Sequence, residues 1–183
     1  MPTIHYWKRF FNVTAMVARR LANISSRYFF RFLYAPSFHK IGTKTFMFYP
    51  FRIDGATAIE VGDSTVFQKG GWIYAISKGK DPVLKIGSRC VFGYSNHITA
   101  VGELIIGDDV LTANNVYISD NHHSYEDILR PIIDQPVIFK REVSIGDGCW
   151  IGENACIIGA SIGRNSIVGA NAVVTKDIPE YSV

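Results

Sequence analysis

Aliphatic residues recur at every sixth position over long stretches of the chain. Each unit begins with an aliphatic residue, usually followed by glycine, with asparagine or aspartate often third and a small residue fifth. Clear examples are IGDGCW and IGENAC over residues 145–156, and IGRNSI and VGANAV over residues 162–173. The same signature begins upstream at Val61, Ile86 and Ile106. Self-similarity at a fixed period indicates a repeat architecture, so it is considered before any local propensity.

A period of six matches neither the turn of a helix nor the strict alternation of a long strand. It fits a solenoid whose coil has three flat faces, each made of one short strand and a turn, with the leading aliphatic residue pointing inward. Glycine and asparagine suit the corners, because tight turns often need a positive φ. At about eighteen residues a coil, the pattern predicts roughly five to six coils between residues 41 and 178. A β-sandwich would instead alternate at period two.

Two segments depart from the hexads. Residues 119–142 lead no clean hexad and contain two prolines, so we expect a loop that protrudes from the prism. The first 40 residues also lack hexads, and their apolar and basic pattern predicts a short helical segment that caps the first coil. The expected organisation is a basic, aromatic cap over residues 1–40 and a solenoid domain over residues 41–183. Residues 77–82 indicate a smaller excursion.

Charge is distributed unevenly along the chain. Residues 1–53 contain nine Lys or Arg and no Asp or Glu, whereas the remaining 130 residues contain ten basic and sixteen acidic ones. In residues 1–35 aromatic and basic side chains alternate, which is typical of segments that lie on anionic membranes. Such a segment suits an enzyme that acts on a lipid-linked glycan at the inner face of the cell membrane. A cap on the prism is the alternative, and both roles are compatible. Nucleic-acid binding is disfavoured, since no recognition module accompanies the charge.

Neither targeting signals nor the cysteines point to a specific function. No stretch approaches 18 uncharged apolar residues, and the apolar run over residues 10–18 lacks a small-residue cleavage site, so we expect neither a spanning helix nor a secretory signal. Cys90, Cys149 and Cys156 have no zinc-type spacing and form no CxxC pair. We expect reduced packing residues in a cytoplasmic protein, although the sequence leaves a nucleophilic thiol open.

The repeats and the loop together resemble the left-handed parallel β-helix acyltransferases. These hexapeptide-repeat enzymes include the maltose and galactoside acetyltransferases and the O-acetyltransferases of bacterial surface polysaccharides. The resemblance covers about residues 60–180. Its most specific pieces are NVYISDNHHSYED (115–127), QPV (135–137), VSIGDGCWIGENACI (143–157) and IGRNSIVGANAVVTKDIP (162–179).

The resemblance implies an all-β, left-handed parallel β-helix with a protruding loop. It also implies a homotrimer with active sites between neighbouring prisms, acetyl-CoA as the acyl donor, and no metal. Members of the family usually continue beyond DIPEYSV with a tail of the form V-x-G-x-P-A. The coenzyme contacts at that end are therefore left open.

In that family one histidine at the start of the loop is the general base, and the resemblance places it at His123, beside His122. An imidazole titrates near neutral pH and can take the proton from a hydroxyl as the oxygen attacks the thioester. Asp120 or Asn121 could orient the ring, although a loop-capping role suits either residue equally well. His97 could face the acceptor sugar or simply complete a corner.

The resemblance also implies which residues bind the coenzyme. Trp150 would line the donor channel, and Ala170, Thr175 and Lys176 would lie along a cleft between subunits. There Lys176 would meet a phosphate of the coenzyme as a point charge. An outward-facing tryptophan and a solvated lysine are the alternatives. Backbone N–H groups at a corner could stabilise the thioester oxyanion, but the sequence does not identify them.

The leading hypothesis is an acetyl-CoA-dependent O-acetyltransferase that acts on a sugar hydroxyl of a surface polysaccharide or its precursor. An N-acetyltransferase for an amino sugar, or an antibiotic acetyltransferase, would use the same donor and the same histidine. A zinc hydrolase such as a γ-type carbonic anhydrase would need His97, His122 and His123 to converge, although adjacent residues point to different sides of a strand. A non-catalytic β-helix binding module would not need the histidine loop. The acceptor and the acyl group cannot be read from the sequence.

Overall fold

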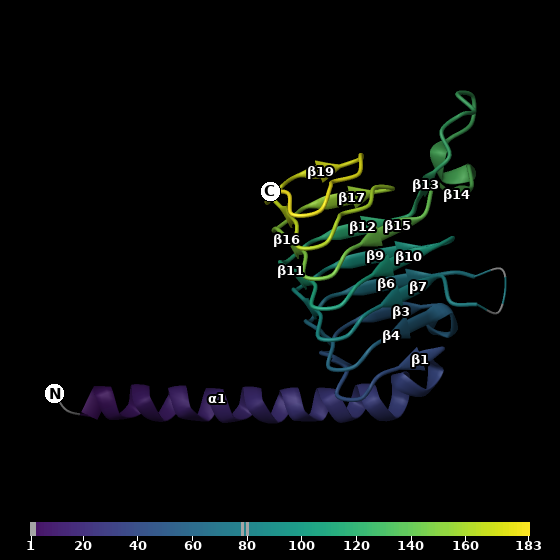
Figure 1. Cartoon of the computed structure of the whole chain (residues 1–183). Helices are drawn as coiled ribbons and strands as arrows, with labels where there is room; N and C mark the ends of the chain where they lie inside the picture. The colour runs from purple at the N-terminus through teal and green to yellow at the C-terminus, as the bar shows by residue number, and fades with distance from the viewer. Residues whose placement is uncertain (1–2, 78, 80) are drawn as a thin grey trace.

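The computed structural model describes residues 3–77, 79 and 81–183, with side chains from residue 11 onward. Short parallel strands stack into a three-faced prism, and the chain visits the three faces in turn (Figure 1). The predicted fold class is confirmed: the body is a left-handed parallel β-helix with one N-terminal helix and one protruding loop.

Each face of the prism is one parallel sheet. The first face holds β1 (Lys40–Ile41), β4 (Ile59–Val61), β7 (Leu84–Ile86), β10 (Leu104–Ile106) and β15 (Val143–Ile145). The second face holds β2 (Phe46–Met47), β5 (Val66–Phe67), β8 (Val91–Phe92), β11 (Leu111–Thr112), β16 (Trp150–Ile151) and β18 (Ile167–Val168). The third face holds β3 (Arg52–Asp54), β6 (Trp72–Ala75), β9 (His97–Ala100), β12 (Tyr117–Ser119), β17 (Cys156–Ile158) and β19 (Val173–Val174).

The leading aliphatic residue of each hexad points into the prism. On the first face Val61, Ile86, Ile106 and Ile145 occupy equivalent positions in neighbouring strands, and all four are buried. Ile162 extends this ladder through an isolated bridge to Ile145. Each of these side chains is covered by the equivalent side chains in the coils above and below it. Burial of each large aliphatic residue therefore contributes about 1.5–3 kcal/mol of transfer free energy.

The coils at the N-terminal end are longer than the eighteen residues expected. Ile41 pairs with Val61, twenty residues further along the chain. Six residues separate Ile41 from Met47, and six separate Met47 from Ile53, but eight separate Ile53 from Val61. The additional residues therefore lie at the corner between the third and the first face. The excursion at 77–82 and the long loop leave the prism at this same corner, although residues 78 and 80 lie outside the described part of the chain.

The N-terminal segment forms α1 (Thr3–Phe29), a π-helical turn η1 (Phe30–Tyr34) and a 3-10 turn η2 (Ala35–Ser37). The helix is 27 residues long, because no glycine or proline interrupts residues 3–34. It lies across the first coil and extends well beyond it (Figure 1). Among the side chains of α1 and η1 described from residue 11 onward, those buried against the prism lie near the end of α1 and in η1. Phe30 is fully buried, and Ser26 Oγ accepts a hydrogen bond of 2.7 Å from the Tyr49 N–H. In the described part of the segment, the contacts expected of a cap are thus found from about Ser26 onward.

The long loop is more regular than expected. It contains β13 (Asn121–His123) paired antiparallel with β14 (Val137–Phe139), and the 3-10 turn η4 (Ile132–Asp134). Another short 3-10 turn, η3 (Ala56–Ala58), precedes β4. Gln135 is buried and donates 2.9 Å hydrogen bonds to the carbonyl oxygens of Asp127 and Arg130, so it holds the outer part of the loop together.

The structure confirms for two of the cysteines that they are buried packing residues. Cys90 and Cys149 are buried, and each lies 3.1 Å from a carbonyl oxygen, that of Gly107 and Gly163 respectively. Burial raises the pKa of both thiols, so the thiolate is disfavoured. Cys156 is half-buried on the third face. Among the described helices none is both long and apolar enough to cross a bilayer.

Candidate functional site

A pocket of about 260 Å³ lies where the third face turns into the long loop. Strands β6, β9 and β12 supply one side of it, and the hairpin of β13 and β14 supplies the other. Its lining residues are Trp72, Tyr74, His97, Thr99, Tyr117, Asn121, His122, His123 and Val137. The structure therefore brings His97, Asn121, His122 and His123 together around one pocket.

Asp120 and Asn121 anchor the base of the loop. Asp120 is fully buried, and its carboxylate accepts hydrogen bonds from the N–H groups of Val101 (3.0 Å) and Gly102 (2.8 Å). The amide of Asn121 donates to Asp120 Oδ1 at 2.7 Å and to the carbonyl oxygen of Thr99 at 3.2 Å. In the described part of the chain neither side chain bonds to an imidazole. The contacts thus favour the loop-capping role for both residues.

The two loop histidines occupy different environments. They are adjacent in β13, opposite Ile138 and Val137 of β14. His123 is exposed, whereas His122 is half-buried, with its ring centroid 5.7 Å from that of Tyr125. The Nδ1 atom of His122 is buried without a hydrogen-bond partner among the described residues. Because an unpaired buried nitrogen costs free energy, this atom is suited to pair with a bound molecule.

A ladder of flat side chains leads up the third face to the histidines. Arg52, Trp72, His97 and Tyr117 occupy equivalent positions in β3, β6, β9 and β12. The rings of Trp72 and His97 stack in parallel with centroids 4.2 Å apart, and Tyr117 lies 5.1 Å from His97. The Arg52 guanidinium covers the other face of Trp72 at 4.3 Å, a favourable cation–π distance. Trp72 is fixed in turn by a 2.8 Å hydrogen bond from its Nε1 to Asp54.

The surroundings of His97 lower its pKa and so favour the neutral imidazole. Burial lowers its pKa, and the nearby Arg52 guanidinium lowers it further. Protonation is therefore opposed at neutral pH. A neutral imidazole offers one N–H donor and one nitrogen acceptor, which is the complement of a sugar hydroxyl.

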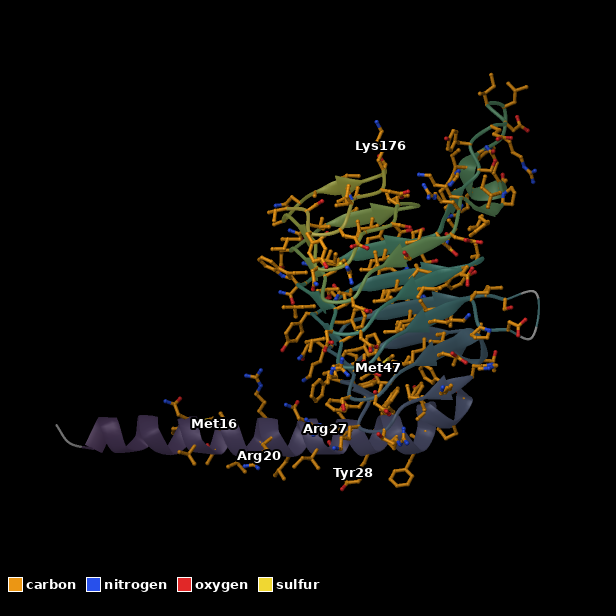
Figure 2. The ribbon with its side chains drawn as sticks, in the orientation of Figure 1. Met16, Arg20, Arg27, Tyr28, Met47 and Lys176 are labelled. Carbon is orange, nitrogen blue, oxygen red and sulfur yellow. The ribbon has the colours of Figure 1, made fainter. Side chains whose placement is uncertain are left out.

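The predicted coenzyme residues lie elsewhere in the chain. Trp150 is on β16 of the second face and is 47% exposed. Ala170 is exposed in the turn after β18, and Thr175 and Lys176 are exposed after β19. In Figure 2 Lys176 points away from the end of the prism. A single chain thus does not bring these residues to the histidine pocket.

Comparisons with known proteins find a hexapeptide repeat and similar acetyltransferases. A model of the hexapeptide repeat of succinyl-transferase matches residues 142–176. The chain is 38% identical over 119 residues to "Probable acetyltransferase" of Mycobacterium tuberculosis, covering 62% of this chain and 39% of that protein. It is 38% identical over 94 residues to "Putative lipopolysaccharide biosynthesis O-acetyl transferase" of Escherichia coli, covering 48% of each. The chain thus contains the hexapeptide repeat and is similar to these acetyltransferases over the matched residues. It spans about half the length of these relatives or less.

Solved structures of two acyltransferases are similar to this chain. An N-acyltransferase from Bacillus cereus, in complex with dTDP and 3-hydroxybutyryl-CoA, has the same fold, with a TM-score of 0.71 at 15% identity over 85% of this chain and 82% of that one. A galactoside acetyltransferase in complex with coenzyme A gives a TM-score of 0.51 at 26% identity, over 78% of this chain and 58% of that one.

Several features of this hexapeptide-repeat protein were missed in the sequence. Trp72 and Tyr117 were not predicted to line the site, although they lie 25 and 20 residues from His97 and stack on it. Asp177 was also missed: its carboxylate accepts a 2.8 Å hydrogen bond from the Ser161 N–H and pairs with Arg141 at 3.0 Å. The backbone hydrogen bond, more than Arg141, lowers its pKa. Asp177 thus joins the last coil to the returning end of the loop. In the described part of the chain, no three His, Cys, Asp or Glu residues are grouped to hold a metal ion.

Proposed function

We propose that the chain is an acyltransferase that transfers an acetyl group from acetyl-CoA to a sugar hydroxyl, with the corner pocket as its acceptor site. The observation that carries the proposal is the pocket itself, whose lining includes the two loop histidines, His97 and the aromatic rings stacked on it. The relatives support the same class, because one is named as an O-acetyl transferase of lipopolysaccharide biosynthesis. A precursor of a surface polysaccharide is accordingly the proposed acceptor.

The proposed step needs one base and one set of oxyanion donors. The acceptor oxygen attacks the thioester carbon, and the imidazole of His123 takes the hydroxyl proton as the new C–O bond forms. The C–S bond then breaks, and the thiolate of coenzyme A recovers that proton from the imidazolium. His123 suits this role because it is exposed in the pocket and can be reached by both substrates. The buried Nδ1 of His122 is proposed to bind the acceptor.

A homotrimer with shared sites completes the proposal. Trp150, Ala170, Thr175 and Lys176 would bind acetyl-CoA from the neighbouring copy, since they do not reach the histidines of their own chain. The outer part of the loop supports an interface between copies, because Ile128, Leu129 and Ile133 are each about nine-tenths exposed. Reduced thiols and the use of acetyl-CoA favour the cytoplasm as its location.

Product analysis distinguishes O- from N-acetylation. The protein should transfer labelled acetyl from acetyl-CoA to oligosaccharides that contain no amino group, and mild alkali should release the label, since esters hydrolyse there and amides persist. Transfer only to amino sugars, in an alkali-stable form, would establish the N-acetyltransferase alternative instead. Failure to transfer acetyl to either class of sugar, with labelled acetyl-CoA bound, would contradict the proposed reaction.

A further inference from the structure

Helix α1 presents an apolar stripe that the rest of the chain does not cover. Its members recur three or four residues apart and therefore share one face of the helix. Their exposed fractions range from 42% for Ile24 to 72% for Phe32. The stripe consists of Val13, Val17, Leu21, Ile24 and Tyr28, and it continues into the π-helical turn with Phe32.

The helix packs on the prism through its other side. Phe30 contacts the rings of Phe38 and Phe51 with centroids 5.9 and 5.8 Å away, and the Arg27 guanidinium lies 4.2 Å above the ring of Phe46. In Figure 2 Tyr28 lies on the side of the helix opposite Met47, a core residue of the first coil. The stripe therefore faces away from the prism, and folding of the chain does not account for it.

The charges near the apolar stripe indicate what kind of partner binds to it. Arg19 and Arg20 are exposed along the helix, and residues 1–53 contain no Asp or Glu. Arg27 and Arg31 are also exposed but contact the prism, at the Phe46 ring and the Gly42 carbonyl oxygen. A second copy docked through the same helix would bring like charges together, which disfavours helix-to-helix pairing between copies. An anionic lipid surface attracts the arginines and accepts the apolar side chains below its headgroups.

We propose that α1 lies flat in the headgroup region of an anionic membrane, with the apolar stripe inserted and the prism standing upright on it. The coils stack away from the helix (Figure 1), so the membrane lies at the N-terminal end of the prism. The histidine loop leaves the prism after β12, the fourth strand of the third face, on the order of 15 Å above the first strand. If the proposed function holds, this height suits an acceptor sugar within a few residues of a lipid anchor.

Vesicle flotation of the full chain tests the proposal. The wild-type protein should float with vesicles of equimolar phosphatidylcholine and phosphatidylglycerol and remain at the bottom with phosphatidylcholine alone. The double variant Val17→Gln, Leu21→Gln should float at least tenfold less. Met16→Gln is the matched control: Met16 is 71% exposed but lies about 100° around the helix from Val17, off the stripe.

The outcome does not depend on enzyme activity or on the proposed acceptor. Both substitutions replace exposed side chains, and unchanged thermal melts would confirm that the variants fold. Equal flotation of the double variant and the wild type would overturn the proposal, as would a wild-type protein that does not float. A smaller assembly in gel filtration of the double variant, without vesicles, would assign the stripe to contacts between copies and would also overturn it.

Discussion

Replacing His123 by alanine should lower the rate of acetyl transfer by about two to four orders of magnitude, the usual contribution of a general base. The exposed side chain makes little contact with the fold, so the variant should keep its melting temperature and its assembly. Single-turnover transfer from labelled acetyl-CoA, with the same sugar acceptor throughout, measures the chemical step directly. Binding of acetyl-CoA should be unchanged, because the base acts on the acceptor.

His122→Ala is the matched control for this prediction, since the two histidines are neighbours in β13. Its main effect should be a weaker affinity for the acceptor, as the buried Nδ1 is proposed to bind that substrate. The reverse pattern, with His122 essential for the chemical step and His123 dispensable, would show that the family resemblance assigns the base to the wrong residue. Full activity of both variants would show that the loop histidines of the pocket take no part in the reaction.

Replacing Asp120 by alanine should destabilise the protein by about 3 kcal/mol or more. The substitution leaves the N–H groups of Val101 and Gly102 and the amide of Asn121 without their acceptor at a buried position. Unpaired buried donors are among the few causes of losses this large. Urea denaturation would measure the change, and the loop should become sensitive to proteolysis because its base is released from the coil below.

The substitution Asp120→Asn tests the contribution of the carboxylate charge separately from that of the side chain's shape. The amide keeps one oxygen acceptor and nearly the same volume, so it should cost clearly less than alanine. A loss below about 1 kcal/mol for Asp120→Ala would contradict the anchoring role, because it would mean that the donors find other partners.

The interior of the prism could be predicted closely, whereas its corners could not. The hexads identify the inward residues, such as Ile86 and Ile106, because a stacked coil repeats one environment at each turn. The twenty-residue advance from Ile41 to Val61 escaped prediction, since the two additional residues lie at a corner where the pattern of burial is weak. The direction of α1 was also unpredictable, because both Phe30 and the stripe around Leu21 are apolar and only packing distinguishes them.

The candidate site could be predicted in part. The loop histidines and His97 were identified because the resemblance and the residue chemistry point to them. Trp72 and Tyr117 were missed, since their stacking on His97 depends on the register between coils, which the corner lengths set. The role of Trp150 stays a prediction, because within one chain it lies on the second face, away from the histidine pocket.

The sharing of one site between two copies can be tested by mixing two defective chains. His123→Ala and Trp150→Ala would be produced together with different affinity tags, and the mixed assemblies would be purified through both tags in turn. In a trimer whose copies are joined head to tail, about one third of the sites then combine an intact His123 with an intact Trp150. Acetyl transfer at subsaturating acetyl-CoA should therefore recover to about one third of the wild-type rate. Mixed assemblies no more active than the two variants assayed separately would contradict a site built from two copies.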